Sequence, residues 1–252
     1  PATLQKALDK GAADTVTTSM EEAVKDADIV VSAVPVEAME SVFTEMAPFL
    51  KSDAVVTDVG STRQTVIAAA RKGLGDKFHQ YAPAHPIAGG EMPGVDYASA
   101  DLFDEKVVIS TPDEGMDPKV VTFIEEAWRK AGARVQAMSP LQHDLTFASV
   151  SHLPHVLAYA LVDMIAREEN AQEKLKMAGA GFRDFTRIAS SSPVMWRDIC
   201  LSNREALSHE LERYRASLDT LQKYIDESDG KALESVFENA VRNRRGLVFP
   251  GK

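Results

Sequence analysis

Short apolar segments alternate with helical patterns through the first half of the chain, and this alternation limits the fold more than any other feature. Buried strands are predicted at residues 28–35, 54–60, 78–82, 106–110 and 134–138. Helices are predicted between them at residues 37–50, 62–72 and 118–131. Thr62 and Asp117 are the expected caps of the last two helices. Near-continuous apolar strands separated by helices are typical of a mainly parallel sheet covered on both faces.

The pattern changes at Ser139–Pro140, after which every segment has helical spacing. The sequence therefore predicts an α/β domain at residues 1–139 and an all-helical domain at residues 140–252. One helical segment has an apolar residue at every third or fourth position, at Leu207, Leu211, Tyr214, Leu218, Leu221 and Ile225. Such a seam packs either inside its own domain or against a second copy of the chain, and its spacing fits both.

Composition narrows the classes of partner. The net charge of −10 argues against a nucleic acid or an anionic membrane surface as the main partner. We find no apolar run near the about 20 residues that a membrane span needs. The single cysteine, Cys200, excludes an internal disulfide and fits a reducing, cytoplasmic location. No metal is expected, because His152 and His155 have no third ligand near them in the sequence.

The α/β half looks like a dinucleotide-binding domain, yet it contains no G-x-G-x-x-G motif after a strand. The chain opens instead on a helical pattern, which in the usual topology follows the second strand. We therefore expect a Rossmann-like, doubly wound sheet whose first strand–helix–strand unit is missing from the sequence. The alternative is an α/β domain that never had a nucleotide site.

A histidine placed just past a predicted strand is the strongest sign of chemistry. His85 follows the strand at residues 78–82 and precedes Pro86 and a pair of glycines. In open α/β sheets the ends of strands are where ligands bind. An imidazole there is suited to accept a proton near neutral pH. Ser61 ends the preceding strand, where its hydroxyl could bond the imidazole or a substrate, or cap the following helix.

Five motifs carry a family resemblance. They lie, in order, at residues 26–35, 57–63, 85–91, 151–155 and 181–190, the last followed by Met195–Trp196. Together they resemble the prephenate/arogenate (cyclohexadienyl) dehydrogenase family. The resemblance implies oxidative decarboxylation of a small dianionic substrate, prephenate or arogenate, in tyrosine biosynthesis. It also implies hydride transfer to NAD or NADP, with NAD slightly favoured, and a homodimer formed through the helical domain.

The resemblance assigns roles to particular residues. His85 is the expected general base, with Ser61 beside it as a second catalytic residue. Arg187 is expected to grip the ring carboxylate, since a guanidinium binds a carboxylate bidentately. His155 is the expected contact on the substrate side, and Glu91 a gate or polar contact at the mouth of the site.

The cofactor side of the site is expected at the ends of the central strands. Val34, Pro35, Gly60 and Ser61 should line the nicotinamide. Two other functions fit parts of the sequence. The missing glycine-rich turn favours a non-catalytic helical dimerisation or binding module. A β-hydroxyacid dehydrogenase fits the two-domain pattern, but such enzymes usually use a lysine on the interdomain helix, and residues 140–164 contain none.

Overall fold

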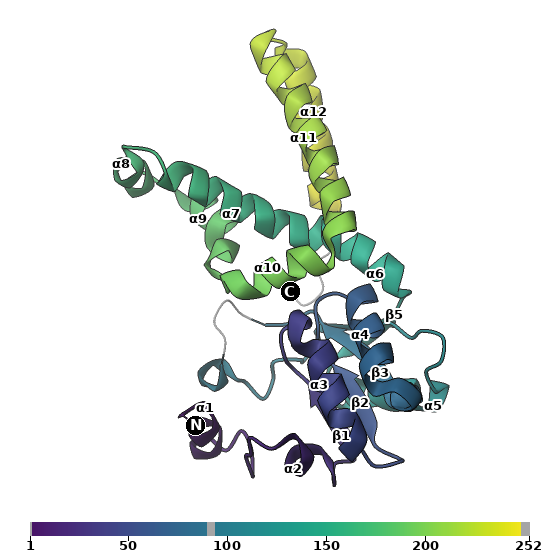
Figure 1. Ribbon diagram of the computed structural model, residues 1–252. Helices are drawn as coiled ribbons and strands as arrows, with labels where there is room; N and C mark the ends of the chain where they lie inside the picture. The colour runs from purple at the N-terminus through teal and green to yellow at the C-terminus, as the bar shows by residue number, and fades with distance from the viewer. Residues whose placement is uncertain (1, 90–93, 248–252) are drawn as a thin grey trace.

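The computed structural model describes residues 2–89 and 94–247. Its first half contains a five-stranded sheet in the order β1-β2-β3-β4-β5 (Figure 1). The strands are β1 (Ile29–Ser32), β2 (Val55–Asp58), β3 (Tyr81–Pro86), β4 (Val107–Ser110) and β5 (Arg134–Ala137). Only the β3–β4 pairing is antiparallel within this sheet, and the other three are parallel. The predicted Rossmann-like, mainly parallel sheet is confirmed.

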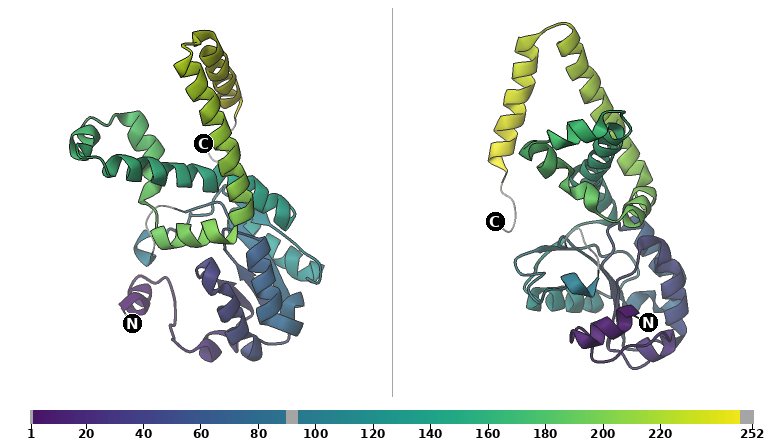
Figure 2. Two further views of the ribbon diagram at one scale, coloured as in Figure 1. Left: turned by 45° about the horizontal axis from the view of Figure 1, so that its top comes forward. Right: turned by 90° about the vertical axis from the view of Figure 1, so that its left-hand side faces the viewer.

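Helices cover the sheet from two sides. On one face α3 (Met39–Met46) packs against α4 (Gln64–Leu74), and Phe43, Val66 and Tyr81 are buried in the core between them and the strands. On the other side lies α5 (Pro118–Lys130), whose cap is Asp117 as predicted (Figure 2). The shorter elements of this half are α1 (Ala2–Asp9), α2 (Met20–Val24), η1 (Val36–Ala38), η2 (Ala47–Phe49), η3 (Gly75–Gln80) and η4 (Val95–Tyr97).

The second half is helical, as predicted. It begins with a nearly continuous helical stretch of α6 (Pro140–Phe147), the π-helical turn η5 (Ala148–His152) and α7 (Leu153–Ala166). The elements that follow are α8 (Ala171–Lys176), α9 (Ala180–Thr186), η6 (Arg187–Ser190), α10 (Pro193–Ser202), α11 (Arg204–Asp226) and α12 (Gly230–Gly246). The last two form a long hairpin that projects away from the sheet (Figure 1).

The third strand differs from the prediction. A 3-10 helix occupies Gly75–Gln80, and the strand runs from Tyr81 to Pro86, so His85 lies inside the strand rather than past it. His85 pairs with Ile109 of β4. The two prolines of this strand interrupt the sequence pattern, because proline has no N–H to give to a sheet ladder.

The start of α4 also differs from the prediction. Thr62 does not cap the helix, because the N-cap position is Arg63 and has no capping side chain of its own. The carboxylate of Asp144, in α6, accepts instead from the backbone N–H groups of Arg63 (2.8 Å) and Gln64 (2.9 Å). A helix of the first domain is therefore capped by a side chain of the second.

Apolar surface remains exposed in the helical half. The stretch Pro140–Ala166 is, by length and composition, apolar enough to cross a membrane, which corrects the expectation from the sequence. Within it, however, buried polar side chains of α6 bond to the sheet domain, as in a packed helix of a globular protein. The predicted seam on α11 is buried at Leu207 but exposed at Leu218 (47%) and Ile225 (58%).

Candidate active site

Adjacent parallel strands bring the predicted residues to one edge of the sheet. Residues 34–35 follow β1, residues 60–61 follow β2, and His85 lies near the carboxyl end of β3. The register pairs Asp58 with Pro83, which places residues 60–61 level with His85. In a parallel sheet this carboxyl edge is the usual place for ligands.

A fully buried ion pair lies beneath this edge. The Arg63 guanidinium donates to both oxygens of Asp58, from Nη2 to Oδ2 at 2.7 Å and from Nη1 to Oδ1 at 3.1 Å. The Tyr81 hydroxyl donates to Oδ1 of the same carboxylate at 2.6 Å. The guanidinium also donates to the carbonyls of Gly60 (2.8 Å) and Ala84 (3.3 Å). These two carbonyls directly precede the two predicted catalytic residues, so one side chain fixes the backbone at both.

Gly60, predicted to line the cofactor, has a structural reason to be glycine. A Cβ added there would lie 2.7 Å from Nη2 of Arg63 and 3.0 Å from Oδ2 of Asp58. Its N–H donates to the same Asp58 oxygen at 2.8 Å. The buried ion pair therefore requires a glycine at this position, and the contact of Gly60 with a cofactor stays a prediction.

His85 is hydrogen-bonded to a second histidine. Its Nδ1 lies 2.8 Å from Nε2 of His143, whose Nδ1 lies 2.9 Å from Oδ1 of Asp144. His143 and Asp144 are 0% and 1% exposed. The Phe147 ring, one turn further along the helical stretch, stacks on His143 with centroids 4.4 Å apart and lies 5.1 Å from the His85 ring. We call this imidazole–imidazole–carboxylate chain the histidine relay.

The protonation states of the relay follow from its surroundings. Burial lowers the pKa of His85 well below its ordinary value, and the positive charge of Arg63 lowers it further. Burial raises the pKa of the Asp144 carboxyl, but the hydrogen bonds from His143, Gln64 and Arg63 together bring that pKa below its usual value. At neutral pH His85 is therefore a neutral base, and Asp144 is an anion.

Two further histidines follow in the π-helical turn and α7. Nδ1 of His152 lies 3.1 Å from the Asn203 amide nitrogen, which also donates to the Asp144 carbonyl at 2.8 Å. Nδ1 of His155 donates to the carbonyl four residues earlier, and its ring stacks on Trp196 at 3.6 Å. The indole N–H of Trp196 is buried and has no hydrogen-bond partner within the described part of the chain. Because His152 is 1% exposed and His155 only half-buried, the geometry favours His155 as the ligand contact.

Arg187 begins η6, directly after α9, and its side chain is exposed. The η6 segment packs against α7, the helix that carries His155. The Tyr159 hydroxyl of α7 fastens the end of this segment by donating to the Ser191 carbonyl at 2.7 Å. Arg187 and His155 thus belong to one packed unit, and their binding of substrate stays a prediction. Glu91 lies outside the described residues.

Both halves of the chain match models of one protein family. Residues 1–137 match the nucleotide-binding domain of prephenate dehydrogenase, and residues 139–239 match its dimerization domain. The chain belongs to the prephenate dehydrogenase family. It is similar to the cyclohexadienyl dehydrogenase of Zymomonas mobilis, with 38% identity over 96% of this chain and 82% of the relative. The prephenate dehydrogenase of Bacillus subtilis is 35% identical over 98% of this chain and 67% of its own length.

Solved structures agree with this assignment. The crystal structure of prephenate dehydrogenase from Aquifex aeolicus superposes with a TM-score of 0.90 at 34% identity, covering 98% of this chain and 87% of that one. A second structure of the A. aeolicus enzyme, in complex with hydroxyphenyl propionate and NAD+, has a TM-score of 0.88 at 36% identity, covering 97% and 86%. The architecture of a prephenate dehydrogenase is therefore shared along nearly the whole chain.

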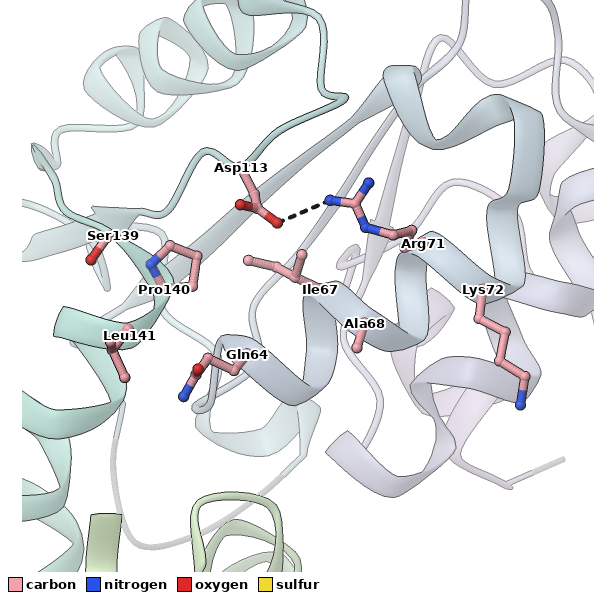
Figure 3. A pocket seen from close by; sticks show the side chains of 9 residues that line it. All are labelled: Gln64, Ile67, Ala68, Arg71, Lys72, Asp113, Ser139, Pro140 and Leu141. Atoms are coloured by element: carbon pink, nitrogen blue, oxygen red, sulfur yellow. Dashed lines mark hydrogen bonds and ion pairs between the residues drawn. The ribbon is translucent and has the colours of Figure 1, made fainter. Parts of the chain in front are cut away.

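A cavity of about 610 Å³ lies beside α4 (Figure 3), and Gln64, which lines it, donates to Asp144 of the histidine relay. Arg71 and Lys72 line it from α4, and Pro140 and Leu141 line it from the start of α6. The Arg71 guanidinium is already paired with Asp113 at 3.0 Å. Asp113 neutralises Arg71, and none of the described residues that line the cavity is a histidine. The cavity is therefore a poorer place for the family's chemistry than the carboxyl edge of the sheet.

Sequence reasoning missed the residues that support the base. His143 and Asp144 form a His-Asp dipeptide at the start of the first helix after the domain junction, four residues before Phe147. The available signal for these two residues was their position, since they are ionisable side chains on the apolar side of a helix that joins two domains. Arg63 belongs to the motif at residues 57–63, but sequence reasoning assigned no role to this arginine. Its burial depends on strands that only the fold brings together.

Proposed function

We propose that this protein catalyses the oxidative decarboxylation of prephenate, arogenate or both, with hydride transfer to NAD or NADP, in tyrosine biosynthesis. The observation that carries the proposal is the histidine relay at the carboxyl edge of the sheet, in a chain of this family. His85 ends the relay as a neutral imidazole, the group needed to take the proton of a ring alcohol. A cytoplasmic location stays a prediction.

In the proposed reaction one proton leaves the substrate oxygen and later returns to it. The substrate hydroxyl gives its proton to the base as its carbon loses a hydride. The opposite ring carbon then loses CO2, and the electrons of the broken bond complete an aromatic ring. The resulting phenolate takes the proton back from the base. Aromatisation drives the reaction, so the protein mainly orients the ring and moves one proton.

The strand ends fit the nicotinamide end of a dinucleotide. Residues 34–35 and 60–61, with small or apolar side chains, follow β1 and β2, which lie two strands and one strand away from the base on β3. When bound, the nicotinamide supplies the hydride acceptor. In our proposal Val34, Pro35 and Gly60 hold its ring at this edge, and the Ser61 hydroxyl bonds the substrate hydroxyl or the imidazole.

Substrate binding is assigned to the helical half. The Arg187 guanidinium binds the ring carboxylate bidentately, and its side chain lies at the solvent-exposed surface of η6. His155 is the further contact on the substrate side. Its Nδ1 donates to a backbone carbonyl, which leaves Nε2 to face a ligand, and a bound carboxylate would favour a proton there. Glu91 is proposed as a gate or a polar contact at the mouth of the site.

We also propose a homodimer through the helical domain. The matching family model is described as a dimerization domain. Within the described residues, the α11–α12 hairpin leaves apolar side chains open to solvent, among them Leu218 (47%), Ile225 (58%) and Phe237 (54%). An apolar surface of this kind on a projecting hairpin fits pairing with the same surface of a second copy.

The test is absorbance at 340 nm with the intact natural protein. Each of prephenate and arogenate is supplied with each of NAD+ and NADP+. We expect reduced nicotinamide and CO2 in equal amounts with at least one of the four combinations. No reduction with any of them would refute the proposed function.

A further inference from the structure

We infer that Asp144 and His143 are positioning residues that fix which nitrogen of His85 carries a proton, and that His143 holds the substrate proton's charge during the reaction. This inference deepens the proposed function and rests on it for its chemical part. Its geometric part depends only on the two distances of the relay, 2.8 Å between the rings and 2.9 Å to the carboxylate.

The proton pattern is set from the carboxylate outwards. Both oxygens of Asp144 accept backbone N–H groups, at 2.8 and 2.9 Å, as an anion does. A carboxylate only accepts, so Nδ1 of His143 must carry a proton and donate it. In a neutral His143 ring Nε2 is then the acceptor, and Nδ1 of His85 must be its donor. The lone pair of neutral His85 is thereby left on Nε2, the nitrogen outside the relay.

The same chain can take up the charge. When His85 accepts the hydroxyl proton at Nε2, its Nδ1 proton can pass to Nε2 of His143. His85 is then neutral again, with its proton on Nε2, and His143 is a cation hydrogen-bonded to the Asp144 carboxylate. After the CO2 has left, the two transfers run backwards and the phenolate regains its proton. No further proton donor, oxidant or reductant is needed.

The charges around the two rings favour this direction. Arg63, from the β2–α4 segment, opposes a positive charge on His85. His143 also feels Arg63, but Asp144 and Asp58 both favour a positive charge there. His152, from the π-helical turn, adds a small repulsion at His85 if it is protonated. Burial opposes a cation on both rings and lowers the pKa of each, but the neighbouring charges favour a cation on the inner ring over the outer one.

Asp144→Asn tests the tautomer. Oδ1 of Asp144 faces both Nδ1 of His143 and the N–H of Arg63, and Oδ2 faces the N–H of Gln64. An asparagine that places its NH2 at the Oδ1 position therefore presents a donor to Nδ1 of His143. Every hydrogen bond of the relay then reverses, and Nε2 of His85 becomes protonated and useless as a base. We expect the ¹⁵N resonance of His85 Nδ1 to move from the protonated to the unprotonated position, with the six histidines assigned by single variants. We expect kcat to fall roughly 10²- to 10⁴-fold, with KM within a few-fold of the wild type.

His143→Gln separates positioning from charge uptake. Its amide oxygen can still accept from Nδ1 of His85 and its NH2 can still donate to Asp144, so the tautomer of His85 is kept. The amide takes up no proton, so we expect kcat to fall at least roughly tenfold and the acidic limb of its pH profile to move. Asp163→Asn, on the exposed side of α7, is the matched control and should leave kcat, KM and the resonance unchanged.

The outcomes are decisive and separable from the function itself. An unchanged His85 resonance together with wild-type kcat in Asp144→Asn overturns the positioning role, and wild-type kcat and pH profile in His143→Gln overturn the charge uptake. If Asp144→Asn fails to fold, wild-type ¹⁵N spectra decide, since a His85 protonated on Nε2 at neutral pH overturns the inference. The spectra need no substrate, so an inactive wild-type protein would refute the proposed function and still leave the tautomer measured.

Discussion

His152 should make the fold sensitive to acid. Its ring is 1% exposed, and its Nδ1 accepts from the Asn203 amide, whose other hydrogen is held by the Asp144 carbonyl. A proton on Nδ1 would face a donor. Burial is the largest cause that lowers the pKa of His152, to about 4 from 6.5.

The size of the effect follows from these two pKa values. Between pH 6.5 and 4 the unfolded chain binds a proton at residue 152 that the folded chain rejects, so the free energy of unfolding falls as the pH falls. The loss begins near pH 6.5 and is complete below about pH 4. A difference of about 2.5 pH units, at about 1.4 kcal/mol per unit, gives a total loss of about 3.5 kcal/mol from His152 alone.

The assay is urea unfolding by circular dichroism at a fixed protein concentration, at pH 7.5 and at pH 4.5. His152→Gln keeps an acceptor for Asn203 but does not titrate. We expect the wild type to lose between about 2 and 3 kcal/mol more than this variant between the two pH values. His209→Gln, at an exposed position of α11, is the matched control and should lose as much as the wild type. Equal losses in the wild type and His152→Gln would refute the reasoning.

Three other predictions test the site and the packing. His85→Asn should lower kcat roughly 10²- to 10⁴-fold with little change in KM, measured at 340 nm, and near-normal turnover would remove His85 as the base. Arg187→Ala should raise KM for the dianionic substrate at least roughly tenfold. Arg187→Lys should not restore the wild-type KM, because lysine lacks the bidentate fork of arginine. A wild-type KM in the lysine variant would argue against a bidentate contact. Gly73→Ala places a Cβ 2.6 Å from Cβ of Phe43 and should lower the free energy of unfolding, measured in urea, by about 1–3 kcal/mol. Gly246→Ala, which has open space around the new Cβ, is the control and should leave that free energy unchanged. Equal stability of the two variants would contradict the close approach of α3 and α4.

Local signals in the sequence were enough to find most elements. The apolar residues at 29–31 and 55–56 mark strands β1 and β2. β2 is almost wholly buried, as in a covered sheet, whereas β1 leaves Ile29 (41%) and Val31 (52%) exposed. Asp117 was identifiable as a cap because a cap bonds its own helix, here at Lys119. The change to helical spacing at Ser139 was also visible in the sequence, because periodicity depends only on residues that are close along the chain.

Long-range bonds were beyond the reach of the sequence. The cap of α4 comes from Asp144, about eighty residues further along the chain, so Thr62 was the natural but wrong choice. His143 became part of the site only because β3 and α6 meet in space. His85 itself was identified correctly as the residue at the sheet edge, although its strand was placed too early because prolines disguise β3.

The buried ion pair under the site is best explained by geometry rather than by stability. Moving an arginine and an aspartate out of water costs several kcal/mol per ion, and their attraction often no more than offsets this. Arg63, however, holds the two carbonyls that precede Ser61 and His85, and no apolar side chain could do so. Its charge also keeps a proton from resting on the outer imidazole, while Asp144 favours one on the inner ring. Arg63 therefore fixes where the base stands, and together with Asp144 it favours the direction in which the proton moves.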